Sequence, residues 1–284
     1  MTSNNILIFI SLLSLSFCIY PIAVFHGIVD SCEMKNTSTL VNDLRRDLGV
    51  HVECIEIGNG FLDTFMKTLE SQVEEACEKI KANPNFQSKF SILGISQGTL
   101  IGRYVIEKCQ MQGQVMRYLS FDGPQMGIGS IPKLTCGKFC DFLVNITAPL
   151  FYKLKDRIAP AAYFKYKYDQ EYYMEHNTFL KMLNNENEVK DEEIYKRFSS
   201  LEKVKLIKNN ADTTIVPRDS SWFMFYDSQG ENIVPLEESE FYKKDFIGLI
   251  KLNEEGKVSF TLFRDEHVIY NIVEYFEEIV DFFL

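Results

Sequence analysis

The sequence has fewer positive than negative charges and almost no long apolar runs. Its 30 lysine and arginine residues face 40 aspartate and glutamate residues, which gives a formal net charge of −10. A surface that neutralises nucleic-acid phosphates needs an excess of positive charge, so this composition argues against nucleic acid as a partner. After residue 25, no apolar stretch approaches the length that crosses a bilayer. We therefore expect any membrane contact to be peripheral.

The N-terminal segment lacks the basic residues that usually open a signal peptide, because residues 1–5 contain no lysine or arginine. Residues 6–17 nevertheless form an apolar region of signal-peptide length. The alternative is a first buried strand or helix. We favour a signal peptide over residues 1–18, because residues 22–25 form a strand candidate that needs no apolar predecessor. Residues 19–284 are then expected to form a single domain.

Six cysteines remain after the predicted signal peptide, an even number that fits three disulfides in an oxidising compartment. They are Cys32, Cys54, Cys77, Cys109, Cys136 and Cys140. The sequence alone does not give their pairing. Two Asn-X-Ser/Thr triplets, at Asn36 and Asn145, are candidate glycosylation sites. Together these features predict a protein of the secretory pathway, lysosomal or secreted.

Strand and helix patterns alternate in the first part of the chain, and no internal repeat is visible. Strands are expected at residues 22–25, 50–57, 90–95 and 118–121, and amphipathic helices at residues 40–48 and 62–81. Such alternation predicts a mostly parallel sheet with helices on both faces. In this architecture, sites lie at the carboxyl ends of the strands.

The alternation is interrupted at residues 131–200, a stretch rich in aromatic residues. We interpret it as a helical insertion that covers the site as a lid and could hold a hydrocarbon chain. The alternative is that its aromatic residues only attach it to the sheet. Alternation resumes with a strand at 204–207. Residues 246–251 and 257–263 resemble the arms of a hairpin, and residues 268–283 an amphipathic helix.

The chemistry is organised around Gly94-Ile95-Ser96-Gln97-Gly98, which follows a buried strand and precedes a helix. This context is typical of a nucleophile elbow, in which a sharp turn exposes the serine hydroxyl at a strand end. The alternative is an ordinary strand-to-helix turn. The turn also places the backbone N–H of Gln97 where an oxyanion forms. A second donor is expected after the first strand, from the N–H of Ile28, with His26 shaping that loop.

A serine nucleophile needs a histidine base and an acid that orients it. Only His176 and His267 follow Ser96. We favour His267, because it follows a strand and precedes the last helix, whereas His176 lies in the predicted insertion. Asp212, behind the strand at 204–207, leads as the acid. The other acids considered are Asp122, which suits a variant topology, and Asp219 and Asp227, which lie further from a strand end; each could instead simply cap a turn.

Four segments carry a pattern that is far more specific than the serine motif alone. They are Gly94-Ile95-Ser96-Gln97-Gly98, His26-Gly27-X-X-Asp30-Ser31-Cys32, Asp212-X-X-Ile215-Val216-X-X-Asp219-Ser220-X-Trp222-Phe223, and the tail from Val234-Pro235-Leu236 through Glu266-His267. Over nearly the whole mature chain, these segments and their spacing resemble the palmitoyl-protein thioesterases. The sequence departs from that family at Ile28 and Val29, where Met and Gly are usual.

The resemblance implies an α/β-hydrolase fold and a lysosomal, glycosylated enzyme that removes long fatty acyl groups from cysteine thioesters of proteins or peptides. It implies Ser96 as nucleophile, Asp212 as acid and His267 as base, with the N–H groups of Ile28 and Gln97 as oxyanion hole. No metal or cofactor is required. It also implies disulfides between Cys77 and Cys109 and between Cys136 and Cys140, which leaves Cys32 and Cys54 to pair with each other.

Three other functions remain open at this point. A secreted lipase or carboxylesterase would use the same triad on oxygen esters, and an acyl-coenzyme A thioesterase would use it on a different thioester. A non-catalytic acyl-binding protein is the least supported alternative, because serine, acid and histidine are all present. The sequence does not give the oligomeric state.

Overall fold

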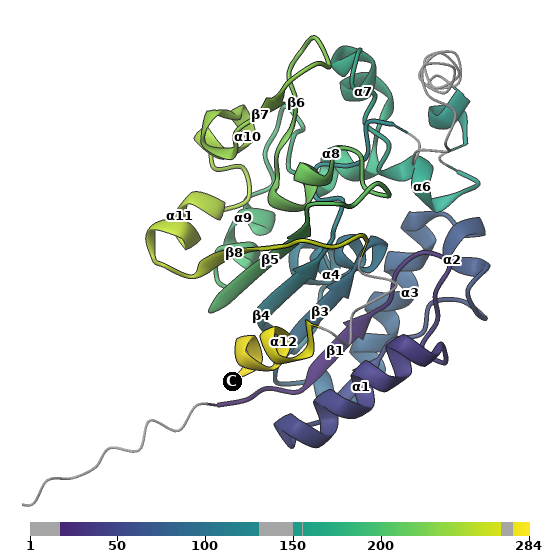
Figure 1. The fold of residues 1–284 in the computed structure, drawn as a ribbon, viewed down its shortest axis with the longest axis vertical. Helices are drawn as coiled ribbons and strands as arrows, with labels where there is room; N and C mark the ends of the chain where they lie inside the picture. The colour runs from purple at the N-terminus through teal and green to yellow at the C-terminus, as the bar shows by residue number, and fades with distance from the viewer. Residues whose placement is uncertain (1–17, 131–149, 155, 268–274) are drawn as a thin grey trace, which may run out of the picture.

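The computed structural model describes residues 18–130, 150–154, 156–267 and 275–284. A six-stranded sheet lies at its centre, in the order β2-β1-β3-β4-β5-β8, with every neighbouring pair parallel (Figure 1). The strands are β1 (Ile22–Phe25), β2 (Val52–Cys54), β3 (Lys89–Ile95), β4 (Gln114–Phe121), β5 (Lys203–Asn209) and β8 (Val258–Phe263). The predicted mostly parallel sheet is therefore confirmed.

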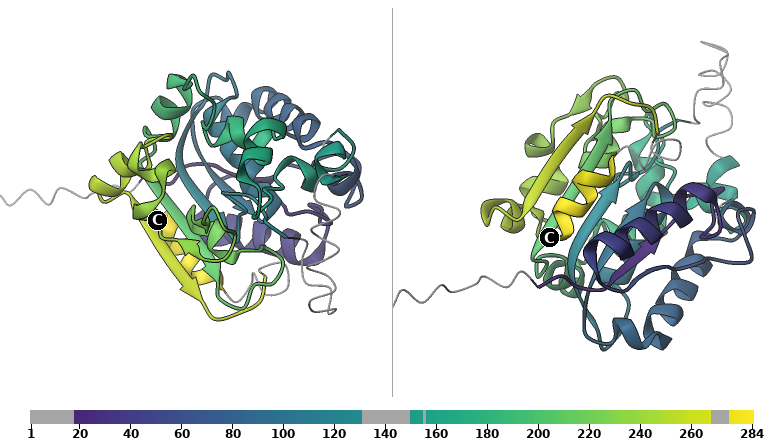
Figure 2. Two further views of the ribbon diagram at one scale, coloured as in Figure 1. Left: turned by 90° about the horizontal axis from the view of Figure 1, so that it is seen from above. Right: turned by 60° about the horizontal axis from the view of Figure 1, so that its bottom comes forward.

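Helices cover both faces of the sheet, and each face has its own apolar core. On one face, α1 (Lys35–Leu48) and α12 (Phe276–Phe283) contact each other over the side chains of β1 and β3 (Figure 2). On the other face lie α3 (Leu69–Ala82), α4 (Gln97–Glu107) and α9 (Glu192–Phe198). Because both faces are buried, the inner strands are apolar on both sides, as buried parallel strands are.

The remaining elements are short. They are α2 (Asp63–Met66), η1 (Pro84–Phe86), α6 (Ala159–Ala162), α7 (Gln170–His176), α8 (Phe179–Leu183), η2 (Arg218–Trp222), β6 (Phe225–Tyr226), β7 (Ile233–Val234), η3 (Leu236–Glu238), α10 (Glu240–Lys243) and α11 (Leu249–Glu254). Strands β6 and β7 pair antiparallel in a sheet of their own. Among the described residues, none of the helices has the length and apolar character that spanning a membrane requires.

Two expectations about local structure were wrong. The segment 246–251 is not a hairpin arm: its second half, from residue 249 on, belongs to α11, whose buried Leu249 and Leu252 are three residues apart, as on one face of a helix. Strand β8 then joins the edge of the sheet in parallel with β5. The single helix expected over 62–81 is divided into α2 and α3, because Thr68 caps a new start by accepting a hydrogen bond from the N–H of Ser71.

Several predictions fall on parts of the chain outside the described residues. These parts are 1–17, 131–149, 155 and 268–274, and they contain most of the predicted signal peptide, Cys136, Cys140, Asn145 and the start of the expected last helix. The described part of the predicted insertion carries α6 to α9. A lid over residues 131–200 remains a prediction.

A buried arginine, Arg103, forms an ion pair within α4 and connects this helix to the end of α8. Arg103 is fully buried, and its Nε donates to Glu107 at 2.9 Å. Its other nitrogens donate to the carbonyl oxygen of Leu183 at 2.8 Å and to the side chain of Asn184 at 2.9 Å. Burial raises the pKa of Glu107 to about 7, although Arg103 opposes the shift. The network therefore fixes one end of α8 against α4.

This raised pKa predicts a pH dependence of stability. The ordinary pKa of 4.5 applies in the unfolded chain, so between pH 4.5 and 7 the folded chain binds more protons at Glu107. Its free energy of unfolding is therefore expected to fall as pH rises through that window, by up to about 3 kcal/mol, at roughly 1.4 kcal/mol per pKa unit. Urea unfolding at pH 5 and pH 7 measures the change. Glu107→Gln should remove most of it, whereas the exposed Glu193→Gln should not; an unchanged difference in Glu107→Gln would contradict the assignment.

Candidate active site

Ser96 lies in a strained turn between β3 and α4. Its backbone has φ 51° and ψ −123°, a region that non-glycine residues rarely occupy, and strain of this kind is concentrated at functional sites. The turn is held by hydrogen bonds from Ser96 N to the carbonyl oxygen of Phe121, at 2.9 Å, and from the N–H and hydroxyl of Thr99 to the carbonyl oxygen of Ser96. The hydroxyl of Ser96 is thus held at the carboxyl end of the sheet.

Gly98 allows α4 to begin directly against the end of β1. A Cβ atom at this position would lie 2.2 Å from the carbonyl oxygen of Phe25 and 2.4 Å from that of His26, too close for any side chain. This contact brings the loop that carries Ile28 beside the N-terminus of α4. Within the described part of the chain, the backbone N–H groups of Ile28 and Gln97 have no hydrogen-bond partner. The next amide, that of Val29, donates to Thr64 at 2.7 Å.

The structure brings His267 and Asp212 to Ser96. His267 Nε2 lies 2.9 Å from Ser96 Oγ, and His267 Nδ1 lies 2.7 Å from Asp212 Oδ2. All three side chains are buried. With Nδ1 protonated, His267 donates to Asp212 and leaves Nε2 to accept from Ser96. An imidazole in this position can take the serine proton, which is what a nucleophilic hydroxyl requires.

Local hydrogen bonds explain how residues 55 positions apart in sequence meet at this point. The loop after β5 pairs with the segment after β8, through Asn210 N to the carbonyl oxygen of Phe263 and Ala211 N to that of Asp265. Asp212 Oδ1 accepts from the N–H groups of Thr214 and Ile215, which orients Oδ2 toward His267. Parallel pairing of β5 and β8 therefore aligns the acid with the histidine.

The other histidine and acid candidates lie elsewhere or play different parts. His176 stacks on Tyr172, with ring centroids 3.8 Å apart, and bonds its carbonyl oxygen. Asp219 pairs with Lys208 at 2.6 Å, and Asp227 caps the turn before β7. Asp122, however, lies beside His267, with Oδ2 3.8 Å from Nδ1. His26 bonds the carbonyl oxygen of Gly27 and the N–H of Ile57, as expected of a residue that shapes this loop.

The side chain of Gln97 forms a network that the sequence did not suggest. Its Nε2 donates to the carbonyl oxygen of Thr64 and to Gln72, and its Oε1 accepts from the hydroxyl of Tyr163. These partners belong to α2, α3 and the residue after α6. The residue after the serine therefore ties three elements to the turn. No pattern in the sequence would have paired Gln97 with Tyr163.

Two disulfides join segments around the site, and one of them holds the loop that carries Ile28. Cys32 is bonded to Cys54, which joins this loop to the end of β2, and Cys77 is bonded to Cys109, which joins α3 to the segment after α4. Both pairs were expected.

Asn36 lies in the first turn of α1 and is exposed, as a glycosylation site must be. Cys18, at the end of the predicted signal peptide, is unpaired and exposed.

Among the residues that the structure describes, two side-chain clusters contain potential metal ligands. In the first, the ligand atoms of Asp122, Asp212 and His267 lie within 4.8 Å of one another. A cation there would replace the Nδ1 proton that Asp212 accepts, and would therefore disrupt the alignment of His267. The second cluster is His26, Cys32 and Glu56. Because the sulfur of Cys32 is bonded to Cys54, it is not available as a thiolate ligand.

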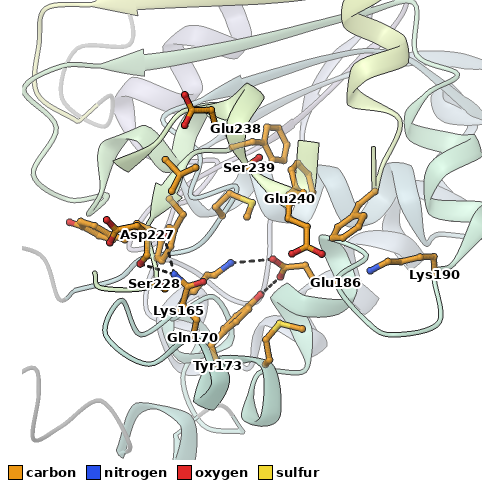
Figure 3. A pocket seen from close by; sticks show the side chains of 18 residues that line it. Lys165, Gln170, Tyr173, Glu186, Lys190, Asp227, Ser228, Glu238, Ser239 and Glu240 are labelled. Carbon is orange, nitrogen blue, oxygen red and sulfur yellow. Dashed lines mark hydrogen bonds and ion pairs between the residues drawn. The ribbon is translucent and has the colours of Figure 1, made fainter. Parts of the chain in front are cut away.

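A cavity of about 400 Å³ lies between α7 and the β6–β7 hairpin (Figure 3). Its walls include the apolar side chains of Met126, Phe223 and Phe225. Figure 3 shows the ammonium of Lys165 and the hydroxyl of Tyr173 both directed at Glu186. Ser96, Asp212 and His267 are not among the residues that line it. The cavity is therefore separate from the serine site, and its buried charges are unfavourable neighbours for a hydrocarbon chain.

Comparison with known proteins identifies the family. The family model described as palmitoyl protein thioesterase matches residues 21–267. "Palmitoyl-protein thioesterase 3" of Dictyostelium discoideum is 30% identical, over 96% of this chain and 93% of its own length. "Palmitoyl-protein thioesterase 1" of Caenorhabditis elegans is 31% identical, over 87% and 86%. "Lysosomal thioesterase PPT2 homolog" of Drosophila melanogaster is 25% identical, over 87% and 85%.

Solved structures are more distant. A monoacylglycerol lipase of Paleococcus ferrophilus matches 93% of this chain and 95% of its own, with a TM-score of 0.49 and 13% identity. The strand order, the parallel pairing and the serine turn after β3 are those of an α/β hydrolase. On the family match and the two relatives of about 30% identity, the chain is a hydrolase that belongs to the palmitoyl protein thioesterase family.

Proposed function

We propose that the chain hydrolyses long-chain fatty acyl thioesters, such as the palmitoyl thioesters of S-acylated proteins or peptides. The observation that carries the proposal is the continuous pair of hydrogen bonds from Asp212 through His267 to Ser96. It lies at the carboxyl end of the sheet in a chain of the thioesterase family. Ser96 is the proposed nucleophile, His267 the base and Asp212 the acid.

The reaction has two steps. His267 Nε2 takes the proton of Ser96 as Oγ attacks the thioester carbonyl carbon. The tetrahedral intermediate then collapses, the carbon–sulfur bond breaks, and the leaving sulfur receives the proton from His267. In the second step His267 takes a proton from water, which attacks the acyl-serine. The fatty acid leaves, and Ser96 recovers its proton. Atoms and charges balance without a metal or cofactor.

The proposed oxyanion hole consists of the N–H groups of Ile28 and Gln97. Its support is that neither group donates a hydrogen bond within the described part of the chain and that the Gly98 contact holds their loops together. Two donors aimed at a developing negative charge are typical of acyl-transfer enzymes. Because the donors are backbone groups, the unusual Ile28 side chain does not remove one of them.

We also propose that the protein works in the secretory pathway, in lysosomes or after secretion. Its support is the two disulfides and the lysosomal name of the Drosophila relative. The signal peptide over residues 1–18 and the glycosylation sites belong to the same proposal. We further propose that residues 131–200 form a lid and that the acyl chain of the substrate lies under it.

The proposal is tested by kinetics on substrates that differ in the leaving atom or in the length of the acyl chain. A palmitoyl thioester and its matched oxygen ester are compared, with a butyryl thioester as the chain-length control. We expect kcat/KM to favour the palmitoyl thioester by at least about tenfold over each of the other two. The preference over the oxygen ester is expected because a thiolate leaves more readily than an alkoxide, and the preference over the butyryl thioester because a longer chain buries more apolar surface. Preference for the oxygen ester would indicate a lipase or carboxylesterase, and preference for palmitoyl-coenzyme A over an S-palmitoyl peptide would indicate an acyl-coenzyme A thioesterase.

A further inference from the structure

A second buried aspartate lies next to His267, on the side of the imidazole that faces Asp212. Asp122 directly follows β4, as Asp212 follows β5. Its side chain is fully buried, and its Oδ2 lies 3.8 Å from His267 Nδ1. The same nitrogen lies 2.7 Å from Asp212 Oδ2. A turn of the ring would therefore move the Nδ1 proton from one carboxylate toward the other.

The carboxylate of Asp122 is held rigidly in this position. The backbone of Asp122 has φ 45°, in the left-handed region, and its N–H donates to the carbonyl oxygen of Ile207 at 3.0 Å. Asn209, the last residue of β5, donates to both carboxylate oxygens at 2.8 Å, from its backbone N–H to Oδ1 and from its side-chain Nδ2 to Oδ2. The carboxylate is therefore already ordered beside His267, so it loses no side-chain entropy during the reaction.

The hydrogen bonds from Asn209 hold the side chain of Asp122 in place, but Asn209 has no charge that would balance the charge of the carboxylate. A buried carboxylate is unfavourable unless hydrogen bonds and an opposite charge offset its desolvation. His267 supplies that opposite charge when it holds the serine proton, because protonated His267 and Asp122 form an ion pair. Asp122 is thus placed to stabilise the imidazolium that forms as Ser96 attacks.

We propose that Asp122 is a second acid for His267. It acts as a positioning residue that supports the imidazolium beside Asp212 and accepts the Nδ1 hydrogen bond when Asp212 cannot. The proposal rests on the proposed role of His267 as base. It goes beyond a triad of three residues, because it gives His267 two acids from neighbouring parallel strands.

Four proteins test this inference: wild type, Asp122→Asn, Asp212→Asn and the double variant. Where a single acid serves the histidine, its amide variant selects the wrong imidazole tautomer and loses about 10⁴-fold in rate. Here Asp122 can still accept from Nδ1, so we expect Asp212→Asn to lose only about 10²-fold. Asp122→Asn alone should lose about tenfold or less, and the double variant about 10⁴-fold or more.

The decisive quantity is the coupling between the two substitutions. If Asp122 only supports the fold, Asp122→Asn will lower the rate by the same factor whether residue 212 is aspartate or asparagine. If Asp122 is a second acid, the factor by which Asp122→Asn lowers the rate will be larger by about tenfold or more when residue 212 is asparagine. Equal factors would overturn the proposal. Asp219→Asn is the matched control, because Asp219 pairs with Lys208 and should cost the same in both backgrounds.

The amide variant is expected to fold. Asn209 Oδ1 has no hydrogen-bond partner among the described residues, so its carboxamide can turn over and accept from the new amide. Thermal unfolding of each variant checks this. If Asp122→Asn does not fold, Asp122→Gly replaces it in the cycle, since glycine adopts the left-handed backbone without strain. The coupling is read in the same way.

The coupling between the two substitutions is measured in two ways. One is the rate of palmitoyl thioester hydrolysis, and the other is the rate at which a fluorophosphonate probe labels Ser96. The second measurement does not depend on the acyl substrate. Coupling in the labelling rate of an enzyme that does not cleave the thioester would defeat the proposed function and keep the second acid. Thioester cleavage with no coupling in either measurement would keep the proposed function and defeat the second acid.

Discussion

Replacing Ser96 with alanine is expected to lower kcat for palmitoyl thioester hydrolysis by about 10⁵- to 10⁶-fold, the cost of deleting an activated serine. His267 and Asp212 would keep their mutual hydrogen bond, but the hydroxyl oxygen that attacks the thioester carbonyl would be missing. The residual rate would come from binding and the oxyanion donors alone. Steady-state kinetics on the purified full chain measure the loss.

Ser221→Ala is the matched control. Ser221 is also buried, and its hydroxyl has no hydrogen-bond partner among the described residues, so its replacement should change kcat by less than about threefold. Mass spectrometry after fluorophosphonate treatment should place the label on the peptide that contains Ser96. A Ser96→Ala protein that keeps more than about one per cent of the activity would end the assignment of Ser96 as nucleophile.

The largest expected effect on stability comes from Arg103→Met. Methionine keeps much of the volume but leaves the carboxylate of Glu107 and the carbonyl oxygen of Leu183 buried without a donor. Removing one partner of a buried ion pair costs about 3–5 kcal/mol in the free energy of unfolding, because the remaining charge is not compensated. Urea unfolding at pH 8, where Glu107 of the wild type is mostly ionised, measures the loss.

The control for this effect is Arg46→Met. Arg46 also forms ion pairs, with Asp43 and Asp47, but its side chain is two thirds exposed. Water can replace its partners, so the urea midpoint should not change measurably. Arg103→Met/Glu107→Leu should recover part of the loss, since it removes the uncompensated charge. A single Arg103→Met variant as stable as wild type would contradict the buried network.

The parallel sheet could be predicted because its signals are local. Residues 22–25, 90–95 and 118–121 are short apolar runs, and amphipathic segments between them have the helical period. The segment 246–251 was misjudged because a short apolar run fits a strand and a buried helix equally well. What decides for α11 is the pair Leu249 and Leu252, which pack into the core of one face of the sheet.

The order of Ser96, Asp212 and His267 could likewise be predicted, since each follows a strand whose carboxyl end lies at the same edge. Their distances could not, because register and loop pairing set them. Asp122 and Asp212 follow the neighbouring strands β4 and β5, and the sequence gives no measure of how near each comes to His267. The contacts of Arg103 with α8 span about 80 residues and leave no trace in any local pattern.

The side chain of Gln97 has a consequence for attempts to exchange parts between members of this family. Because Gln97 shares hydrogen bonds with Thr64, Gln72 and Tyr163, the geometry of the nucleophile turn depends on two consecutive helices, α2 and α3, and on a residue about 90 positions further along the chain. A segment around Tyr163 grafted from a relative would therefore bring its own geometry to the serine, even though it supplies no reacting group. Substrate preference and turnover would change together unless the residues at 64, 72 and 97 were transferred with it.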